Sequence, residues 1–359
     1  MQLFKHFRFV GGRVVKTGIA VFLTALVCDL LDWPAMFAVI TAIVTIEPTA
    51  TDSIKKAYIR FPASAIGALY AAFIAHFLGD RPITYTLVAL ATIITCYKLH
   101  LTAGTLVATL TGVAMISTIQ ENYITDFFVR LGTTTLGLTI SSVVNIFVLP
   151  PNYSTRIAKN INSLFVKTGN VLHRRGIEIL QNKSLHKETK MIFKDIQREL
   201  EKTDTLCEYQ KEEWKFHRSS RKDVRNFHYE YKKLNTLRQL LFHIGNLIYL
   251  PAQDYSFTEV EEKNILTAAQ SMRGILHHPS FNMEDHHYVL MKKLLEEFWD
   301  DPQELNKQKF SNVRHHFTCE TVLLYELLSI HDLLEELNQI HSLEMQREKV
   351  LEKSRSHQQ

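Results

Sequence analysis

The sequence lacks the short motifs that mark nucleotide-driven and catalytic proteins. It has no G-x-x-x-x-G-K-S/T loop, no G-x-G-x-x-G after a predicted strand and no motif for Ser/His/Asp or Cys/His catalysis. Its four cysteines, Cys28, Cys96, Cys207 and Cys319, lie far apart and form no C-x-x-C spacing, which argues against disulfides and a zinc site. We therefore expect neither an enzyme nor an ATP-driven mechanism, and no cofactor or metal.

Charged residues are scarce at the beginning of the chain and dense afterwards. Residues 1–150 contain 10 Lys and Arg and 7 Asp and Glu, whereas residues 151–359 contain 31 and 30. This difference divides the chain into an apolar domain, 1–150, and a polar domain, 151–359. Nucleic acid is not expected as a partner of the polar domain, because nearly balanced charges create no field of one sign.

Six apolar segments precede Pro150, and a helix needs about 20 mostly apolar residues to cross a bilayer. The first ends without a small-x-small cleavage site and is followed by further apolar segments, so it is predicted to be a span rather than a signal peptide. The fourth is short and turns tightly into the fifth, so this pair is alternatively a partly re-entrant hairpin. The six are Val14–Leu31, Pro34–Ala50, Phe61–Leu78, Ile83–Tyr97, Leu101–Ile119 and Phe127–Leu149.

Basic residues occur in alternate connections between these segments. The remaining connections, around Asp32, Asp80 and Glu121, are acidic or near neutral. Because basic loops stay in the cytoplasm, the pattern predicts six spans in the cell membrane with both termini inside. The basic residues are Lys5, Arg8, Arg13 and Lys16, then Lys55, Lys56 and Arg60, then Lys98, and finally Arg156 and Lys159.

The stretch Phe37–Gly67 is the most informative part of the apolar domain. It predicts an apolar helix broken at Glu47-Pro48, a short basic loop, and a second helix that Arg60 opens. Pro-interrupted hydrophobic segments point to binding sites in transport proteins. Glu47 has two interpretations: its carboxylate carries a coupling proton, or it ends the helix and pairs with Lys55 or Arg60.

The two halves of the apolar domain resemble each other. Arg60–Gly67 matches Arg130–Gly137 at an offset of 70 residues, with Arg, a small hydroxyl residue and Gly in the same places. With six spans, this match predicts an inverted repeat. Small residues also recur at every fourth position, which favours close helix packing; a pore-lining role for Thr133, Ser141 or Asn145 is the alternative. The rows are Ala63, Gly67, Ala71 and Ala75; Gly104, Ala108 and Gly112; and Thr133, Gly137, Ser141 and Asn145.

Three cationic residues are candidates for an anion path. A carboxylate that crosses the bilayer needs a positive counter-group, and Lys16, Arg60 and Arg130 could supply it. We expect Arg60 and Arg130 to face one path, with hydroxyl groups such as Ser64 and Thr134 along it. Alternatively, Lys16 and Arg60 only snorkel to the interface and set the topology.

The polar domain is predicted to be entirely helical. Amphipathic helices are expected from Ile157 to Leu172 and in five later segments, with a capping box at Thr258 and Glu261 and a frayed tail from Leu351. Three adjacent histidine pairs, at 277–278, 286–287 and 315–316, are interpreted as solvated side chains rather than metal ligands. The later helical segments are Ser184–Phe216, Asp223–Tyr249, Thr258–Leu276, Glu284–Trp299 and Asn312–Leu343, with breakers at Pro251, Pro279 and Pro302.

Three pieces of sequence carry a family resemblance. Arg13–Gly18, Thr45–Thr49 and the Arg60-x6-Gly67-Ala68 segment resemble the aromatic acid exporter superfamily, in particular its small single-copy branch of Gram-positive bacteria. The resemblance covers essentially the whole chain, and plant malate channels are more distant relatives. It implies six spans, a cytosolic helical domain, dimeric assembly and membrane passage of organic anions.

The sequence therefore predicts an all-α membrane protein, with a six-helix transmembrane bundle over 1–150 and a cytoplasmic helical domain over 151–359. Its expected function is export of small organic, including aromatic, acids as a homodimer in the lipid bilayer, driven by an ion gradient or the membrane potential. One alternative is a passive anion channel. Another is a membrane-anchored scaffold or sensor that acts through its cytoplasmic helices.

Overall fold

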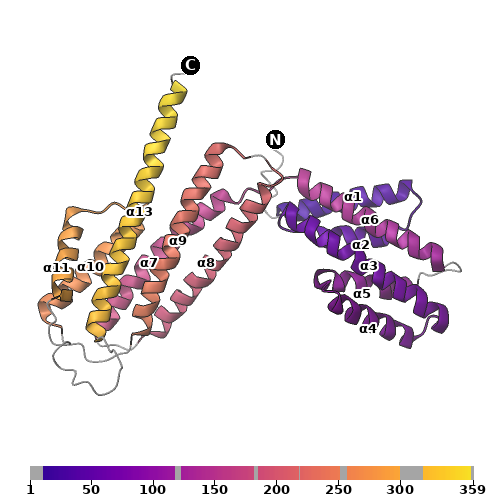
Figure 1. Ribbon diagram of the computed structural model, residues 1–359, viewed down its shortest axis with the longest axis horizontal. Helices are drawn as coiled ribbons and strands as arrows, with labels where there is room; N and C mark the ends of the chain where they lie inside the picture. The colour runs from indigo at the N-terminus through magenta and orange to yellow at the C-terminus, as the bar shows by residue number, and fades with distance from the viewer. Residues whose placement is uncertain are drawn as a thin grey trace. The chain divides into compact units, whose positions relative to one another are not determined.

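The computed structural model describes residues 11–117, 123–181, 185–217, 219–250, 257–299 and 318–356. Within these ranges the chain forms twelve α-helices and no strand, which confirms the all-helical class (Figure 1). The chain divides into two compact units, residues 1–152 with 209–218 and residues 153–208 with 219–359. Several predicted features lie outside the described residues: Lys5, Arg8, Glu121, Ser184, Pro251, Pro302, the start of the Asn312–Leu343 helix and the histidines at 315–316.

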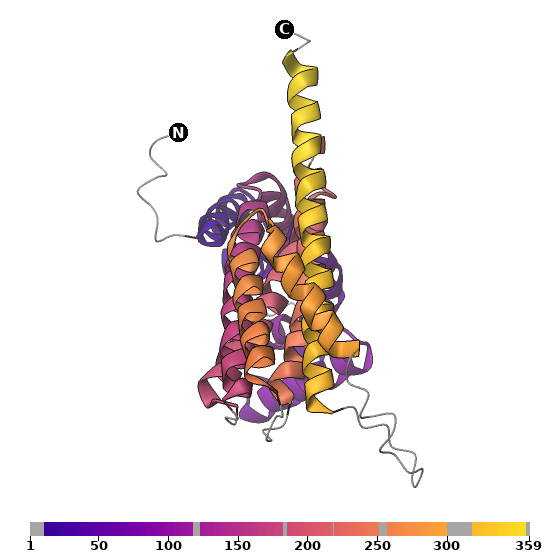
Figure 2. The same ribbon diagram turned by 90° about the vertical axis from the view of Figure 1, so that its left-hand side faces the viewer.

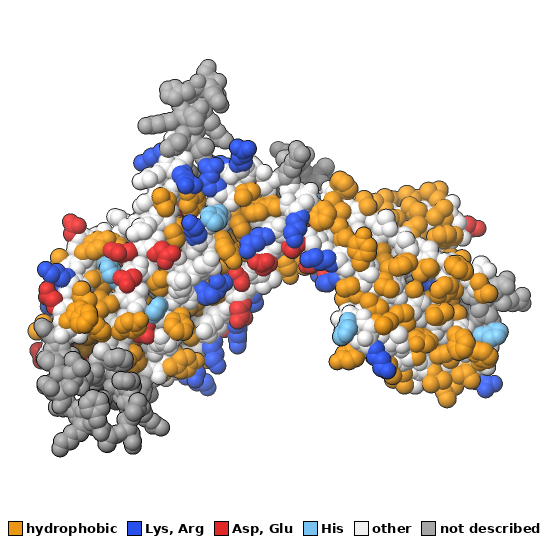
Figure 3. Space-filling model, in the orientation of Figure 1, with side chains coloured by type: hydrophobic (Ala, Val, Ile, Leu, Met, Phe, Trp, Pro, Cys, Tyr) orange, Lys and Arg blue, Asp and Glu red, His pale blue; other side chains and the backbone are white. Residues whose placement is uncertain are grey.

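The first unit contains six helices at the places of the six predicted segments. Leucine and aromatic side chains such as Phe22, Phe73 and Leu106 cover its outside, and Figure 3 shows this unit as mostly hydrophobic surface. By length and composition, α3 and residues 124–147 of α6 can cross a membrane, while α2, α4 and α5 are apolar but shorter. The helices are α1 (Gly12–Leu30), α2 (Ala35–Thr45), α3 (Ala50–Leu78), α4 (Pro82–Lys98), α5 (Thr102–Ile116) and α6 (Tyr123–Phe147).

The chain around the Glu47-Pro48 break differs from the prediction. The break itself is present, because α2 ends at Thr45 and the C-cap residue Ile46 is extended. The expected basic loop is wrong, since α3 begins at Ala50 and continues through Pro62 to Leu78. The Thr49 side chain accepts a hydrogen bond from the Asp52 amide at 3.1 Å, a standard N-cap that starts the helix ten residues before Arg60. Arg130 likewise does not open its helix, because α6 begins at Tyr123.

The two three-helix halves of this unit are related by an internal two-fold repeat. Gly67 of α3 packs directly against the carbonyl oxygen of Ala108 in α5, and Gly137 of α6 packs against that of Ala38 in α2. Both glycines and both alanines are 70 residues apart, so the contact is reciprocal, as a two-fold axis requires. A Cβ atom has no room at either glycine. The repeat is therefore much longer than the eight-residue match in the sequence.

The turns that follow α1 and α4 also match. Asp32 and His100 both have positive φ, 54° and 56°. The amide of the next residue donates to the carbonyl of Cys28 in the first turn and of Cys96 in the second, at 2.9 and 2.8 Å. Both cysteines are completely buried. Asp32 and His100 are 68 residues apart, and so are Cys28 and Cys96. The matching turns follow α1 and α4, so the repeat includes these two helices.

The second unit is a bundle of amphipathic helices with a leucine-, isoleucine- and phenylalanine-rich core. The predicted capping box is confirmed, with Thr258 and Glu261 each bonding the other's backbone amide. The frayed tail predicted from Leu351 is wrong for residues 351–356, because α13 continues to Ser356 (Figure 2). No Pro or Gly in this stretch ends the helix. The helices are α7 (Ser154–Leu180), α8 (Lys187–Glu213), α9 (Arg221–Tyr249), α10 (Glu259–His277), α11 (Asp285–Trp299) and α13 (Cys319–Ser356), and the end of α8 belongs to the first unit.

Candidate functional site

Arg60 is held by groups around the break between α2 and α3. Its Nη2 donates to Glu47 Oε1 at 2.8 Å, and its Nη1 donates to the Val44 carbonyl at 3.1 Å. The end of α2 leaves that carbonyl without a helical partner. Arg60 Nε donates to the Ala103 carbonyl at the start of α5 at 3.3 Å. The guanidinium therefore joins α2, α3 and α5, and its charge is matched by Glu47.

Glu47 pairs with two cations of α3. Besides Arg60, Lys56 lies with its Nζ 3.0 Å from Glu47 Oε2. Lys55, the other partner considered from the sequence, instead lies 3.7 Å from Glu212. Pro48 disfavours helical geometry at Glu47 and so lets the carboxylate turn back toward α3. This arrangement matches the interpretation of Glu47 as a helix-ending residue in an ion pair.

Asn145 of α6 connects Lys16 to the same break. The buried Lys16 ammonium donates to Asn145 Oδ1 at 2.8 Å and to its carbonyl at 3.1 Å. Asn145 Nδ2 lies 2.7 Å from Ser53 Oγ and 3.1 Å from the carbonyls of Glu47 and Thr49. Asn145 thus satisfies two carbonyls of the non-helical backbone at the break, where buried backbone needs hydrogen-bond partners.

Glu213, at the end of α8, supplies a buried carboxylate to this network. Its Oε1 accepts from the Ala50 amide, the first residue of α3, at 2.8 Å. Its Oε2 lies 3.2 Å from His217 Nδ1, and His217 Nε2 donates to the Ile146 carbonyl at 2.8 Å. Sequence analysis missed Glu213, because nothing in an acidic, amphipathic segment indicates a contact 163 residues earlier.

Arg130, in the second turn of α6, occupies a different environment. Its side chain is 4% exposed, and its guanidinium carbon lies 3.6 Å from the centroid of the Phe37 ring. Nη2 donates to Thr111 Oγ1 at 2.6 Å. Nε and Nη1 have no hydrogen-bond partner, and no carboxylate pairs with this arginine, among the residues that the structure describes. Arg130 therefore keeps unmatched donors and an unmatched charge.

Hydroxyl groups from three helices surround the Arg130 contact. Ser64 Oγ of α3 lies 3.5 Å from Thr111 Oγ1 of α5 and 3.4 Å from Thr134 Oγ1 of α6. All three residues are buried. Thr111 was not among the predicted residues. Its signal was its place beside Gly112, in the row of small residues on α5.

The predicted site residues thus fall into two clusters. Lys16, Glu47, Pro48 and Arg60 lie at the helix break, where the charges of Glu47 and Arg60 are matched. Ser64, Arg130 and Thr134 meet around Thr111, where a guanidinium retains free donors that fit a carboxylate. No group of three or more His, Cys, Asp or Glu side chains suits a metal ion within the described ranges.

Comparison with known proteins places the chain in a family. A family model described as "Aromatic acid exporter family member 1" matches residues 8–148. A UPF0421 protein of Bacillus cereus is 44% identical over 340 residues, 95% of this chain and 96% of the relative. UPF0421 proteins of Oceanobacillus iheyensis and Staphylococcus haemolyticus are 38% and 37% identical, covering 91% and 89% of this chain and 95% and 96% of their own lengths. The chain therefore belongs to the aromatic acid exporter family, in a branch shared with UPF0421 proteins of Bacillaceae and Staphylococcus.

Proposed function

We propose that this protein exports small organic acids, aromatic acids among them, across the cell membrane. In this proposal α1–α6 span the bilayer, both termini lie in the cytoplasm, and the second unit forms a cytoplasmic helical domain. Membership of the exporter family supports transport, and the apolar outside of the first unit supports a lipid environment. A homodimer is the proposed assembly, following the family resemblance.

The observation that carries the proposal is the unmatched guanidinium of Arg130. A buried charge without a counter-charge is strongly destabilising, by several kcal/mol even after relaxation. An organic acid on its way through the bundle would provide that counter-charge. Its carboxylate would accept from one of the two unpartnered donors, Nε or Nη1, which lie on different edges of the guanidinium, while Phe37 would contact its apolar part.

Arg60 enters the same mechanism as the cytoplasmic partner. Its fork is held by Glu47, so an incoming anion must displace that carboxylate. Protonation of Glu47 would weaken the ion pair and free Arg60 for the substrate. The anion would then pass from Arg60 to Arg130 along Ser64 and Thr134. A proton that reaches Glu47 from outside would open the ion pair, and its release to the cytoplasm would close the pair again. The proton would thus move inward as the anion moves outward, which would couple export to an inward proton gradient.

Transport in reconstituted vesicles tests this function. Benzoate-loaded vesicles that contain the wild-type protein should release benzoate faster than benzoate-loaded vesicles without protein. A proton gradient directed against benzoate movement should drive benzoate accumulation. Arg130→Gln should weaken apparent substrate affinity about 10- to 150-fold, the value of one charge-assisted contact. Arg130→Lys should weaken apparent substrate affinity less than Arg130→Gln, because lysine keeps the positive charge. Arg81→Gln is the matched control, since Arg81 is exposed before α4.

Three results separate the alternatives. Accumulation against a benzoate gradient supports an exporter, whereas release that follows only the benzoate gradient and the membrane potential indicates a passive channel. No release at all would refute transport of this substrate, and no release over a panel of organic acids would leave a membrane-anchored scaffold or sensor. Rates are normalised to inserted protein, because an arginine that only anchors its helix would change insertion and not transport per molecule.

A further inference from the structure

The contact between α7 and α8 is a row of polar bridges. Lys167 of α7 donates to both carboxylate oxygens of Glu199 in α8, at 2.6 and 2.7 Å. Asn160 Nδ2 donates to Thr203 Oγ1 at 3.2 Å. Asn160 and Lys167 are seven residues apart and so lie on one face of α7. Each donates a hydrogen bond to an acceptor of α8.

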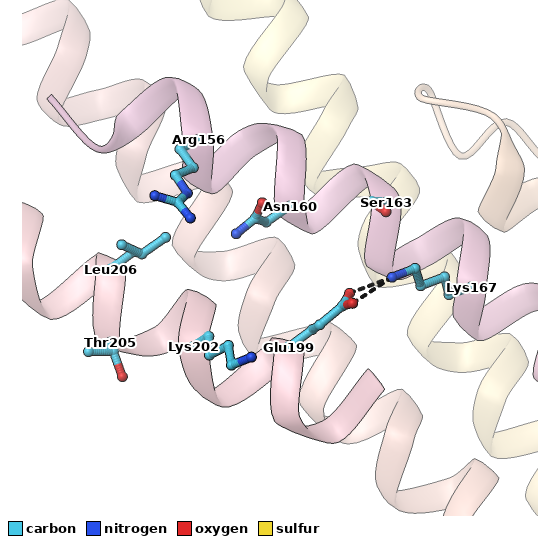
Figure 4. Close-up of a pocket in the computed structure, with 8 residues that line it drawn as sticks. All are labelled: Arg156, Asn160, Ser163, Lys167, Glu199, Lys202, Thr205 and Leu206. Carbon is cyan, nitrogen blue, oxygen red and sulfur yellow. Dashed lines mark hydrogen bonds and ion pairs between the residues drawn. The ribbon is translucent and has the colours of Figure 1, made fainter. Parts of the chain in front are cut away.

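A hollow lies beside these two contacts. The hollow has a volume of about 510 Å³ and lies between α7 and α8, inside the second unit. Figure 4 shows Arg156 and Asn160 directed from α7 toward α8, with Glu199 turned away toward Lys167. The volume falls in the range of about 300–1,000 Å³ that is typical of small-molecule sites.

The charge of the hollow is unbalanced. Arg156, Lys167 and Lys202 line it, whereas Glu199 is the only acidic residue among the described ones in its wall and is engaged by Lys167. Neither Arg156 nor Lys202 has an ion-pair partner among the residues that the structure describes. The wall presents apolar as well as polar surface, and Asn160, Ser163, Thr205 and Leu206 complete it.

We propose that this hollow binds a phosphoryl group between Arg156 and Lys202. A phosphate monoester carries a charge of about −1.5 to −2 at pH 7 and three acceptor oxygens, which suits two cations that have no ion-pair partner. The Arg156 fork fits two of those oxygens, and Lys202 acts as a point charge. This site is independent of the proposed transport path, because all its residues lie in the second unit.

Calorimetric titration of the full-length protein tests the site. The protein is placed in nanodiscs of phosphatidylcholine and titrated with glycerol 3-phosphate, with neutral glycerol as the comparison. Arg156→Gln and Lys202→Gln should each weaken binding about tenfold, the effect of losing one charge-assisted contact. Lys194→Gln is the matched control, because Lys194 is an exposed lysine of α8 outside the hollow, and its affinity should equal that of the wild type. Binding should also weaken as salt rises.

A second set of nanodiscs distinguishes the source of the phosphoryl group. If phosphatidylglycerol in the disc competes with glycerol 3-phosphate, the natural ligand is a lipid headgroup; if it does not, the ligand is a soluble phosphate ester. Both results support the site. Failure of the wild type to bind glycerol 3-phosphate in phosphatidylcholine discs, or equal binding by all three variants, overturns it. All variants lie at exposed positions, so folding is not at stake.

Discussion

The hydroxyl groups of Ser64 and Thr134 lie 3.4 Å apart, although the two residues occupy the same position in the two halves of the first unit. Two equivalent atoms can touch only near the axis that relates them. The two-fold axis of the repeat therefore passes between α3 and α6 at this contact. Arg130 lies beside it, bonded to Thr111, which is itself 3.5 Å from Ser64. The unmatched charge is thus close to the centre of the repeat, where transporters of repeated design bind their substrates.

The reciprocal glycine contacts should have equal energetic weight. Gly67→Ala and Gly137→Ala each force a methyl group into a carbonyl oxygen of the neighbouring helix. We expect each to lower stability by about 1–3 kcal/mol, as overpacking does. Gly18→Ala is the control, because nothing lies within 4 Å of its added Cβ. Thermal unfolding of the purified protein measures all three, and a stable Gly137→Ala beside an unstable Gly67→Ala would contradict the repeat.

The proposed topology places Asp32 outside the cell and Lys98 in the cytoplasm. Both side chains are exposed, so a cysteine at either position can react. Three native cysteines are buried, and replacing Cys319 by Ser removes the partly exposed fourth. In intact cells an impermeant thiol reagent should label Asp32→Cys and not Lys98→Cys. The opposite pattern would invert the orientation.

Glu213 should stabilise the beginning of α3. Its carboxylate accepts from the Ala50 amide and lies at the positive end of the helix dipole. We expect Glu213→Ala to cost about 1–2 kcal/mol locally, as the loss of a helix cap does. Hydrogen exchange of residues 50–53 should then accelerate. Glu201→Ala, an exposed position of α8, should leave this exchange unchanged.

The sequence predicted the helices well and their connections less well. Apolar length located α1–α6, and helical periodicity located the helices of the second unit. The start of α3 was missed because Lys55, Lys56 and Arg60 suit both a cytoplasmic loop and a helix, and only the Thr49 cap distinguishes them. The close pairing of Arg60 with Glu47 followed from their charges. Glu213 did not, since a contact between distant segments leaves no local pattern.

The histidine pair at 286–287 illustrates another limit. Adjacent helical residues point about 100° apart, so one side chain can face solvent while the other faces the core. His286 is exposed, but His287 is 1% exposed and hydrogen-bonds to Ser271 at 2.9 Å and His331 at 3.1 Å. The expectation of solvated side chains is therefore wrong for His287. Composition alone could not decide which histidine the helix turns inward.

Burial of His287 makes stability depend on pH. Burial first, and then the nearby His331 and His286, lower the pKa of His287 to about 4 from an ordinary value of 6.5. The unfolded chain therefore binds the proton more readily, so stability is full above pH 6.5 and falls as the pH drops toward 4. The loss is on the order of 3 kcal/mol at most. His287→Gln should flatten the pH dependence of thermal unfolding, whereas His286→Gln should not.

The ion pair between Glu47 and Arg60 should show strong coupling between its two charges. Glu47→Gln leaves Arg60 buried with carbonyl partners only, and Arg60→Gln leaves Glu47 with Lys56 alone. Removing one partner of a buried pair costs roughly 2–5 kcal/mol, much of it from the charge left behind. The double variant leaves neither charge, so it should be more stable than the sum of the single losses predicts. Additive losses in thermal unfolding would mean that the two charges act independently.

The same variants separate a structural ion pair from a proton-coupled gate. Glu47→Gln resembles the protonated carboxyl in shape and charge, so it should mimic the state in which Arg60 is released. If Glu47 carries the coupling proton, this variant should still release benzoate down its gradient but no longer accumulate it in response to a proton gradient. Lys56→Gln keeps both Glu47 and Arg60 and serves as the matched loss of a neighbouring charge. Accumulation by Glu47→Gln at the wild-type rate would show that the proton travels elsewhere, and the Glu47–Arg60 pair would then only fix the break between α2 and α3.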